Sequence, residues 1–204
     1  MFIIGSMSVL IPSLVVVYLL VKREYFPRPI KALVMLALIK FLFEVVAIIP
    51  LYFKVNTYGI TQTGLENTYL SLEFILFAYY FRSIVIGGKK WTSVFVGQVV
   101  LWSIALQFSE PANQFSVFVL SVGSIVVTIL ALHSIYQVTT YEKVLNNYNY
   151  KLWFAVAAII TQIGHVPLID YLSDWSVFRS TYLIATITAN VVFGLGFIIY
   201  KRAK

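Results

Sequence analysis

The chain has 204 residues, of which 60% are hydrophobic and only 11% charged, and its mean hydropathy is +0.89. This composition excludes an ordinary soluble domain and indicates an all-α, polytopic transmembrane helix bundle with little mass outside the bilayer. The absence of cysteine excludes disulfides, thiol catalysis and cysteine-ligated zinc.

Seven apolar runs of roughly 18 to 24 residues are long enough to cross a hydrocarbon core as helices. We expect them in a single transmembrane domain over 1–204, near 1–22, 30–53, 67–87, 91–109, 115–138, 151–172 and 177–200. The first run has neither a basic n-region nor a small-residue cleavage site, so we expect it to be a retained helix.

Basic residues are distributed unequally between the predicted loops. Of the 15 lysines and arginines, twelve fall on one side, Lys54 and Arg179 fall on the other, and Lys40 lies inside a span. Short loops rich in Lys and Arg stay in the cytoplasm. We therefore expect a multi-pass protein of the cytoplasmic (inner) membrane with its N-terminus outside and its C-terminus in the cytoplasm. Nucleic-acid binding is not expected, because the basic residues are scattered between spans.

Two carboxylates lie well inside apolar runs, Glu44 in the second expected helix and Glu73 in the third. Ionisable groups within a span are costly and usually face the interior of a bundle or a hydrated cavity. The helical rise places Glu73 about 10 Å and Glu44 about 13 Å from the outer helix ends. We expect both to point into a common hydrated recess near the outer surface.

Other polar residues join this predicted site. Lys40 precedes Glu44 by one helical turn, which predicts either an internal ion pair or a Glu44 that is free to engage a ligand or a proton. His165 falls in the same layer. Gln162 and Asn190 complete the candidate ligand or proton site, and the alternative is that these groups form a packing network.

The sequence offers little support for an enzyme. It contains no His-Glu-x-x-His and no Gly-x-Ser-x-Gly motif, and its two histidines, His133 and His165, are expected on opposite sides of the bilayer. We predict no catalytic residues, no resident metal and no cofactor. A single site from Glu44, Glu73 and His165 that binds Zn²⁺ or H⁺ stays open as an alternative.

Two loops and one glycine pair have predicted roles. The polar loop 54–66 is expected to be an irregular outer lid, and the segment from Thr139 to Lys151 is either a docking surface for a cytosolic protein or a solvated connector. Gly194-Leu195-Gly196 predicts close helix packing or a slight bend.

A shift of about 117 residues lays the last three helices over the first three. It places Pro50-Leu51 on Pro167-Leu168 and Glu73 on Asn190. Parallel three-helix repeats around a linker helix are a known transporter plan, and chance and common ancestry both remain open. The seven-helix sugar transporters of the PQ-loop group share this layout, but the chain contains no Pro-Gln dipeptide, which argues against membership.

Several short motifs occur in a characteristic order: a basic proline loop, Phe43-Glu44, the stretch 67–74 (Asn-Thr-Tyr-Leu-Ser-Leu-Glu-Phe) and Leu152-Trp153-Phe154. In this order the chain resembles a loosely defined group of small seven-helix inner-membrane proteins of Bacteroidota. The resemblance implies a fold, a compartment and work alongside cytosolic signalling or defence partners. In size and character the chain is also similar to membrane accessory proteins of RNA-targeting CRISPR systems.

Together these features predict a non-enzymatic membrane protein with a sensory or regulatory role. Its outward polar pocket would be coupled to a cytoplasmic partner, and homo-oligomerisation is left open. The alternative is a small-solute transporter or ion-conducting pore, including a membrane effector or accessory protein of a phage-defence system. An intramembrane enzyme is the third reading.

Overall fold

The computed structural model describes residues 2–22, 25–53, 62–85, 117–141, 149–169 and 175–202, together with Ser93, Val96, Gly97 and Val100. Side chains are described over 10–22, 25–43, 69–85, 121–140, 149–165 and 184–202 and at those four residues. Every regular element in this part of the chain is an α-helix, so the all-α prediction is confirmed there.

Six long helices occupy most of the described residues. They are α1 (Phe2–Val21), α2 (Arg28–Phe53), α3 (Gln62–Ile84), α5 (Val117–Tyr141), α6 (Tyr150–Ile169) and α7 (Trp175–Arg202). The helix expected near 91–109 lies outside the described residues, apart from the four single residues named above, which are helical.

The third helix begins at Gln62 and not near residue 67. Residues 62–66 of the expected irregular loop 54–66 are therefore helical, and that expectation was wrong for these five residues. Gln, Leu and Glu are good helix formers, and the single Gly64 costs about 1 kcal/mol without ending a helix.

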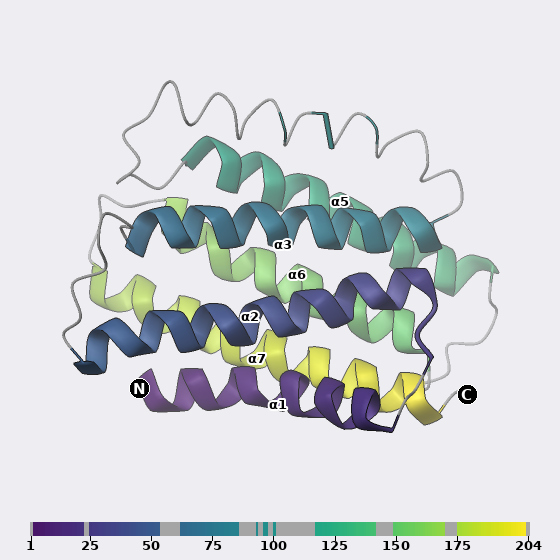
Figure 1. Cartoon of the computed structure of the whole chain (residues 1–204). Helices are drawn as coiled ribbons and strands as arrows, with labels where there is room; N and C mark the ends of the chain where they lie inside the picture. Colours follow the sequence, from purple (N-terminus) through teal and green to yellow (C-terminus); the bar gives the residue numbers. More distant parts are fainter. Residues whose placement is uncertain are drawn as a thin grey trace.

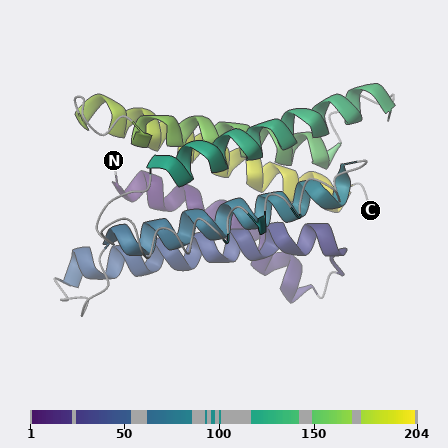
Figure 2. The ribbon, with the colours of Figure 1, turned by 90° about the horizontal axis from the view of Figure 1, so that it is seen from above.

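The six helices form a closed ring. Each packs against the next in chain order, with α3 against α5, and α7 closes the ring by packing on α1. Figures 1 and 2 show the ring as two rows of three, α1–α2–α3 and α5–α6–α7, with α2 and α6 in the middle of their rows.

The two rows have matching directions. The helices α3 and α5 are neighbours that run the same way, and the two ends of the chain lie at opposite ends of the bundle (Figure 1). The end of α3 at Ile84 and the start of α5 at Val117 therefore lie at opposite ends of the bundle.

The order of helix contacts is the same in the two rows. If α1, α2 and α3 are renamed α5, α6 and α7, and the reverse, each contacting pair of helices becomes another contacting pair. The contact between α3 and α5, for example, becomes the contact between α7 and α1. Phe77 of α3 and Phe193 of α7 meet with ring centroids 6.4 Å apart. Their separation of 116 residues is one short of the shift that aligns the two halves of the sequence.

Apolar side chains cover the outside of the bundle. Two stretches, Ser121–Thr140 of α5 and Ile184–Arg202 of α7, are long and apolar enough to cross a bilayer, a property that core helices of soluble proteins share. Only 33% and 39% of their most apolar windows are buried, however, so most of each window faces outward. Leu14, Leu42 and Ile163 are exposed on three further helices.

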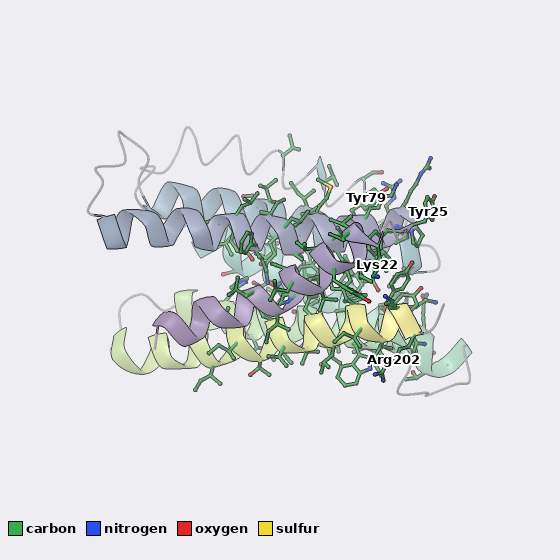
Figure 3. The ribbon with its side chains drawn as sticks, turned by 60° about the horizontal axis from the view of Figure 1, so that its bottom comes forward. Lys22, Tyr25, Tyr79 and Arg202 are labelled. Atoms are coloured by element: carbon green, nitrogen blue, oxygen red, sulfur yellow. The ribbon has the colours of Figure 1, made fainter. Side chains whose placement is uncertain are left out.

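Basic side chains gather at one end of the bundle. The label "basic end" is used for the end where α1, α3 and α7 finish and α2 and α6 begin, which carries Lys22, Arg28, Lys31, Arg82, Lys151, Lys201 and Arg202. Figure 3 shows Lys22, Tyr25, Tyr79 and Arg202 at this end. Here the Lys201 ammonium lies 4.4 Å from the centroid of the Tyr18 ring, which ties α7 to α1.

Glycines permit the close helix contacts. A Cβ built on Gly196 would lie 2.7 Å from the Phe154 ring of α6, and one on Gly194 would lie 2.9 Å from the Ile11 side chain of α1. Gly123 of α5 is equally tight, 2.5 Å from the ring of Phe74. The close packing expected at 194–196 is therefore confirmed.

These contacts predict a selective cost of methyl groups. G123A and G196A should each lower the free energy of unfolding by about 1 to 3 kcal/mol, because a buried ring must move. G97A is the matched control: none of the described side chains lies within 4 Å of a Cβ at this position, so alanine should be neutral or stabilise by up to about 1 kcal/mol. Denaturant titration in detergent measures all three, and equal effects would contradict the assignment of tight packing.

Candidate functional site

A buried cluster of charged and polar side chains joins the two rows. Glu73 of α3 is fully buried, and its Oε2 lies 3.5 Å from the Nζ of Lys40 on α2. The hydroxyl of Tyr69, one turn earlier on α3, donates a short hydrogen bond to the same oxygen. The Phe43 ring stacks on Tyr69 at 4.7 Å and keeps it in place.

The opposite row contributes a histidine. Nε2 of His165 on α6 lies 3.8 Å from Oε1 of Glu73, and its Nδ1 lies 3.3 Å from Oε1 of Gln162, one turn earlier on the same helix. The edge of the imidazole also meets the Phe74 ring, with centroids 6.1 Å apart. His165 and Gln162 are both buried.

Some polar atoms near this cluster have no hydrogen-bond partner among the residues that the structure describes. They include Nε2 of Gln162, Oε1 of Glu73 and both amide atoms of Asn190 on α7, all buried. Asn190 lies one turn before Phe193, as Glu73 lies one turn before Phe77, and the two helices are parallel. Asn190 is thus at about the depth of Glu73.

The cluster lies deeper than the sequence suggested. Glu73 is eleven residues from either end of α3, about 16 Å at the helical rise, because α3 begins at Gln62. Lys40 is likewise near the middle of α2. The expected depth of about 10 Å for Glu73 is therefore corrected, and the pair of Lys40 and Glu73 is central along α2 and α3.

An aromatic layer separates the cluster from the basic end. It consists of five buried rings, Phe77, Phe81, Phe154, Phe193 and Phe197, each on the basic-end side of the cluster on its own helix. The ring of Phe154 contacts those of Phe193 and Phe197 at centroid distances of 5.3 and 5.1 Å. This part of the interior is filled by packed side chains.

Sequence reasoning identified most of these residues and missed some relations between them. The structure brings Lys40, Glu73, His165 and Gln162 together. The described partner of Lys40 is Glu73, across helices, and the side chain of Glu44 lies outside the described residues. Tyr69 was missed, although its position one turn before Glu73 on the same helix face was a usable signal.

The cluster suits charge and hydrogen-bond chemistry better than metal binding. In the described part of the chain, no three His, Cys, Asp or Glu side chains gather at a position that could hold a metal ion. The ammonium of Lys40 lies beside the carboxylate and would repel a divalent cation. The described donors and acceptors are those of a proton site or of a site for a small polar solute.

Comparison of the chain with protein families, with curated proteins and with solved structures found no match.

The ion pair predicts a stability effect specific to Lys40. K40M leaves the Glu73 carboxylate buried without its cation, so it should lower the free energy of unfolding by about 3 to 5 kcal/mol. K31M is the matched control, because Lys31 is exposed and its described contact is a cation–π contact with Tyr25 at 5.4 Å, so its cost should be under about 1 kcal/mol. SDS titration measures both.

The double variant K40M/E73L completes the test. Because it removes both charges, it should recover most of the stability that K40M loses. Equal stabilities of wild type and K40M, or no recovery in the double variant, would show that the two side chains are not energetically coupled.

Proposed function

We propose that the protein is an integral protein of the cytoplasmic membrane with seven spanning helices, its N-terminus outside and its C-terminus in the cytoplasm. We further propose that it is a non-enzymatic sensor or regulator. The buried cluster around Glu73 receives a small ligand or a proton from the outer side. The output passes at the basic end to a cytosolic partner, with the segment between Thr139 and Lys151 as the docking candidate.

The distribution of polarity supports a bilayer environment. The outer surface carries large apolar side chains on all six helices, whereas lysine, glutamate, histidine, glutamine and asparagine are among the buried residues. A protein in water has the reverse arrangement. In lipid, ionisable residues face the interior of the bundle and pair with one another.

The basic end supports the orientation. Seven described Lys and Arg side chains gather there, and the parallel directions of α3 and α5 support the proposal of one more crossing between them. An odd number of crossings places the two termini on opposite sides of the membrane. The basic side is the cytoplasmic one by the bias of short loops.

One observation supports a sensor over an open pore: the aromatic layer fills the interior between the cluster and the basic end. A ligand at Glu73 cannot pass this layer without a rearrangement of packed rings. Such a site is suited to shifting the equilibrium between helix arrangements, which a partner at the basic end could detect.

A transporter is the second candidate, favoured by the exchange relation between the two rows. Transporters built from parallel repeats bind their substrates near the bilayer midplane, where the repeats meet. The cluster joins both rows near the middle of α2 and α3. Measured flux separates this candidate from a sensor.

The orientation can be tested with single cysteines, since the natural chain has none. In intact cells, K151C and R202C should resist a membrane-impermeant maleimide, whereas T57C, between α2 and α3 at the other end, should react. All three should react after permeabilisation. Labelling of the first two in intact cells would reverse the orientation.

The sensory role predicts coupling without flux. A fluorophore on K151C should change its emission between wild-type and E73Q backgrounds, because loss of the Glu73 charge weakens the contacts that join α3 to α2 and α6. Proteoliposomes should leak protons no faster than empty vesicles. L152C, one residue further along α6, serves as a second labelling position.

Each outcome of this experiment decides between the candidates. A signal change with background flux supports the sensor. Flux above background that falls in E73Q supports the transporter. Unchanged emission at both labelled positions, together with background flux, would rule out a coupled site at Glu73.

A further inference from the structure

The two oxygens of the Glu73 carboxylate have unequal surroundings. Oε2 accepts the hydrogen bond from Tyr69 and lies 3.5 Å from the ammonium of Lys40. Oε1 is buried, receives no hydrogen bond from any described residue, and lies 3.8 Å from Nε2 of His165. A carboxylate oxygen that has left water without receiving a donor is unfavourable.

The other imidazole nitrogen fixes where the hydrogen of His165 resides. Nδ1 lies 3.3 Å from Oε1 of Gln162, and an amide oxygen can only accept, so Nδ1 carries the hydrogen and donates it. A neutral imidazole has a single N–H. Nε2 therefore presents a lone pair toward Oε1 of Glu73, and two acceptors face each other.

We propose that the ligand of this site is a proton, taken up between Nε2 of His165 and Oε1 of Glu73. This inference rests on the proposed sensory function and names its signal. The proton comes from water on the outer side and forms a new N–H bond on Nε2. No other covalent bond changes, and the charge of the Lys40, Glu73 and His165 group rises from zero to plus one.

Protonation gives both facing atoms a partner. The new N–H donates to Oε1, and the separation of 3.8 Å should shorten toward the 2.7 to 2.9 Å that is typical of charge-assisted hydrogen bonds. Glu73 belongs to α3 and His165 to α6, which lie in opposite rows. Proton uptake thus adds an ion pair that draws the two rows together.

Other charged and titratable groups define the setting of this proton. Lys40 on α2 opposes a second positive charge, whereas Glu73 on α3 favours it, and Tyr69 on α3 is the remaining titratable neighbour described on these elements. The side chain of Glu44 lies outside the described residues. The described titratable side chains of α1, α5 and α7 lie toward the basic end: Tyr18, Lys22, His133, Tyr136, Tyr200, Lys201 and Arg202.

Histidine NMR tests the proposal directly. The chain has two histidines, so H133Q leaves His165 as the single imidazole, and His133 is exposed and distant from the cluster. In liposomes of the ¹⁵N-histidine-labelled H133Q protein, the neutral form at high pH should carry its hydrogen on Nδ1. On titration from alkaline to acidic pH it should convert to the doubly protonated form.

A second variant shows that Glu73 is the partner. In H133Q/E73Q the doubly protonated signal should be lost over the same pH range, because an amide cannot stabilise the imidazolium as a carboxylate does. Circular dichroism and thermal unfolding establish that this variant remains folded. If it does not, H133Q/Q162L, which removes only the acceptor of Nδ1, should redistribute the neutral hydrogen toward Nε2.

The results separate this inference from the function on which it rests. A His165 ring that stays neutral throughout the range, or carries its neutral hydrogen on Nε2, overturns the proton site even if E73Q changes the fluorescence at position 151. A ring that titrates as expected in a protein without that fluorescence response supports the proton site and overturns the sensor.

Discussion

The ion pair between Lys40 and Glu73 is the constraint on which the rest of the interior depends. Each charge lies near the middle of its helix, where neither side chain can reach water by extending along the helix. Leaving either charge without the other would cost several kcal/mol. The pair therefore fixes the rotation and the register of α2 against α3, and the stacked rings of Phe43 and Tyr69 follow from that register.

The row α5–α6–α7 contacts the ion pair of Lys40 and Glu73 through α6. His165 and Gln162 approach Glu73 from α6, and α7 packs against α6 through Gly196, which leaves room for the Phe154 ring. The two rows thus meet at a polar centre on one level and at an aromatic layer on the next. The polar centre specifies which helices face each other, because a rotated helix would leave its polar group unpaired in an apolar setting. The aromatic layer supplies most of the packing.

Much of this arrangement could be predicted from residue patterns. Apolar run lengths predicted seven helices, and the six that the structure describes have bounds close to the expected ones, apart from the start of α3. A carboxylate within such a run predicted the burial of Glu73, and the glycines at 194 and 196 predicted close packing. The start of α3 was missed because its first turns are polar, and polar residues signal loop and helix end alike. The pairing of Lys40 with Glu73 was missed because periodicity reports faces within one helix, not contacts between two.

The internal repeat is a feature that the structure shows more clearly than the sequence does. A shift of 117 residues rested on one identical dipeptide, which is too little to distinguish ancestry from chance. Helix order and direction carry more information than sequence identity here, because the ring maps onto itself when its halves are exchanged. The residues at corresponding depths have nevertheless diverged in charge, with Glu73 in one half and Asn190 in the other. The exchange relation therefore describes the scaffold and not the site.

The contact between α1 and α7 has a consequence for biogenesis. The helix α1 is made well before its neighbour α7, and Tyr18 meets Lys201 across 183 residues. Until α7 has been made, Gly194 is not there to receive Ile11, and one flank of α1 stays open to lipid or to an insertase. Loop-closure entropy makes such distant pairings slow. Ring closure therefore has to wait for α7, and a chain without α7 would present an unsealed edge to the membrane quality-control machinery.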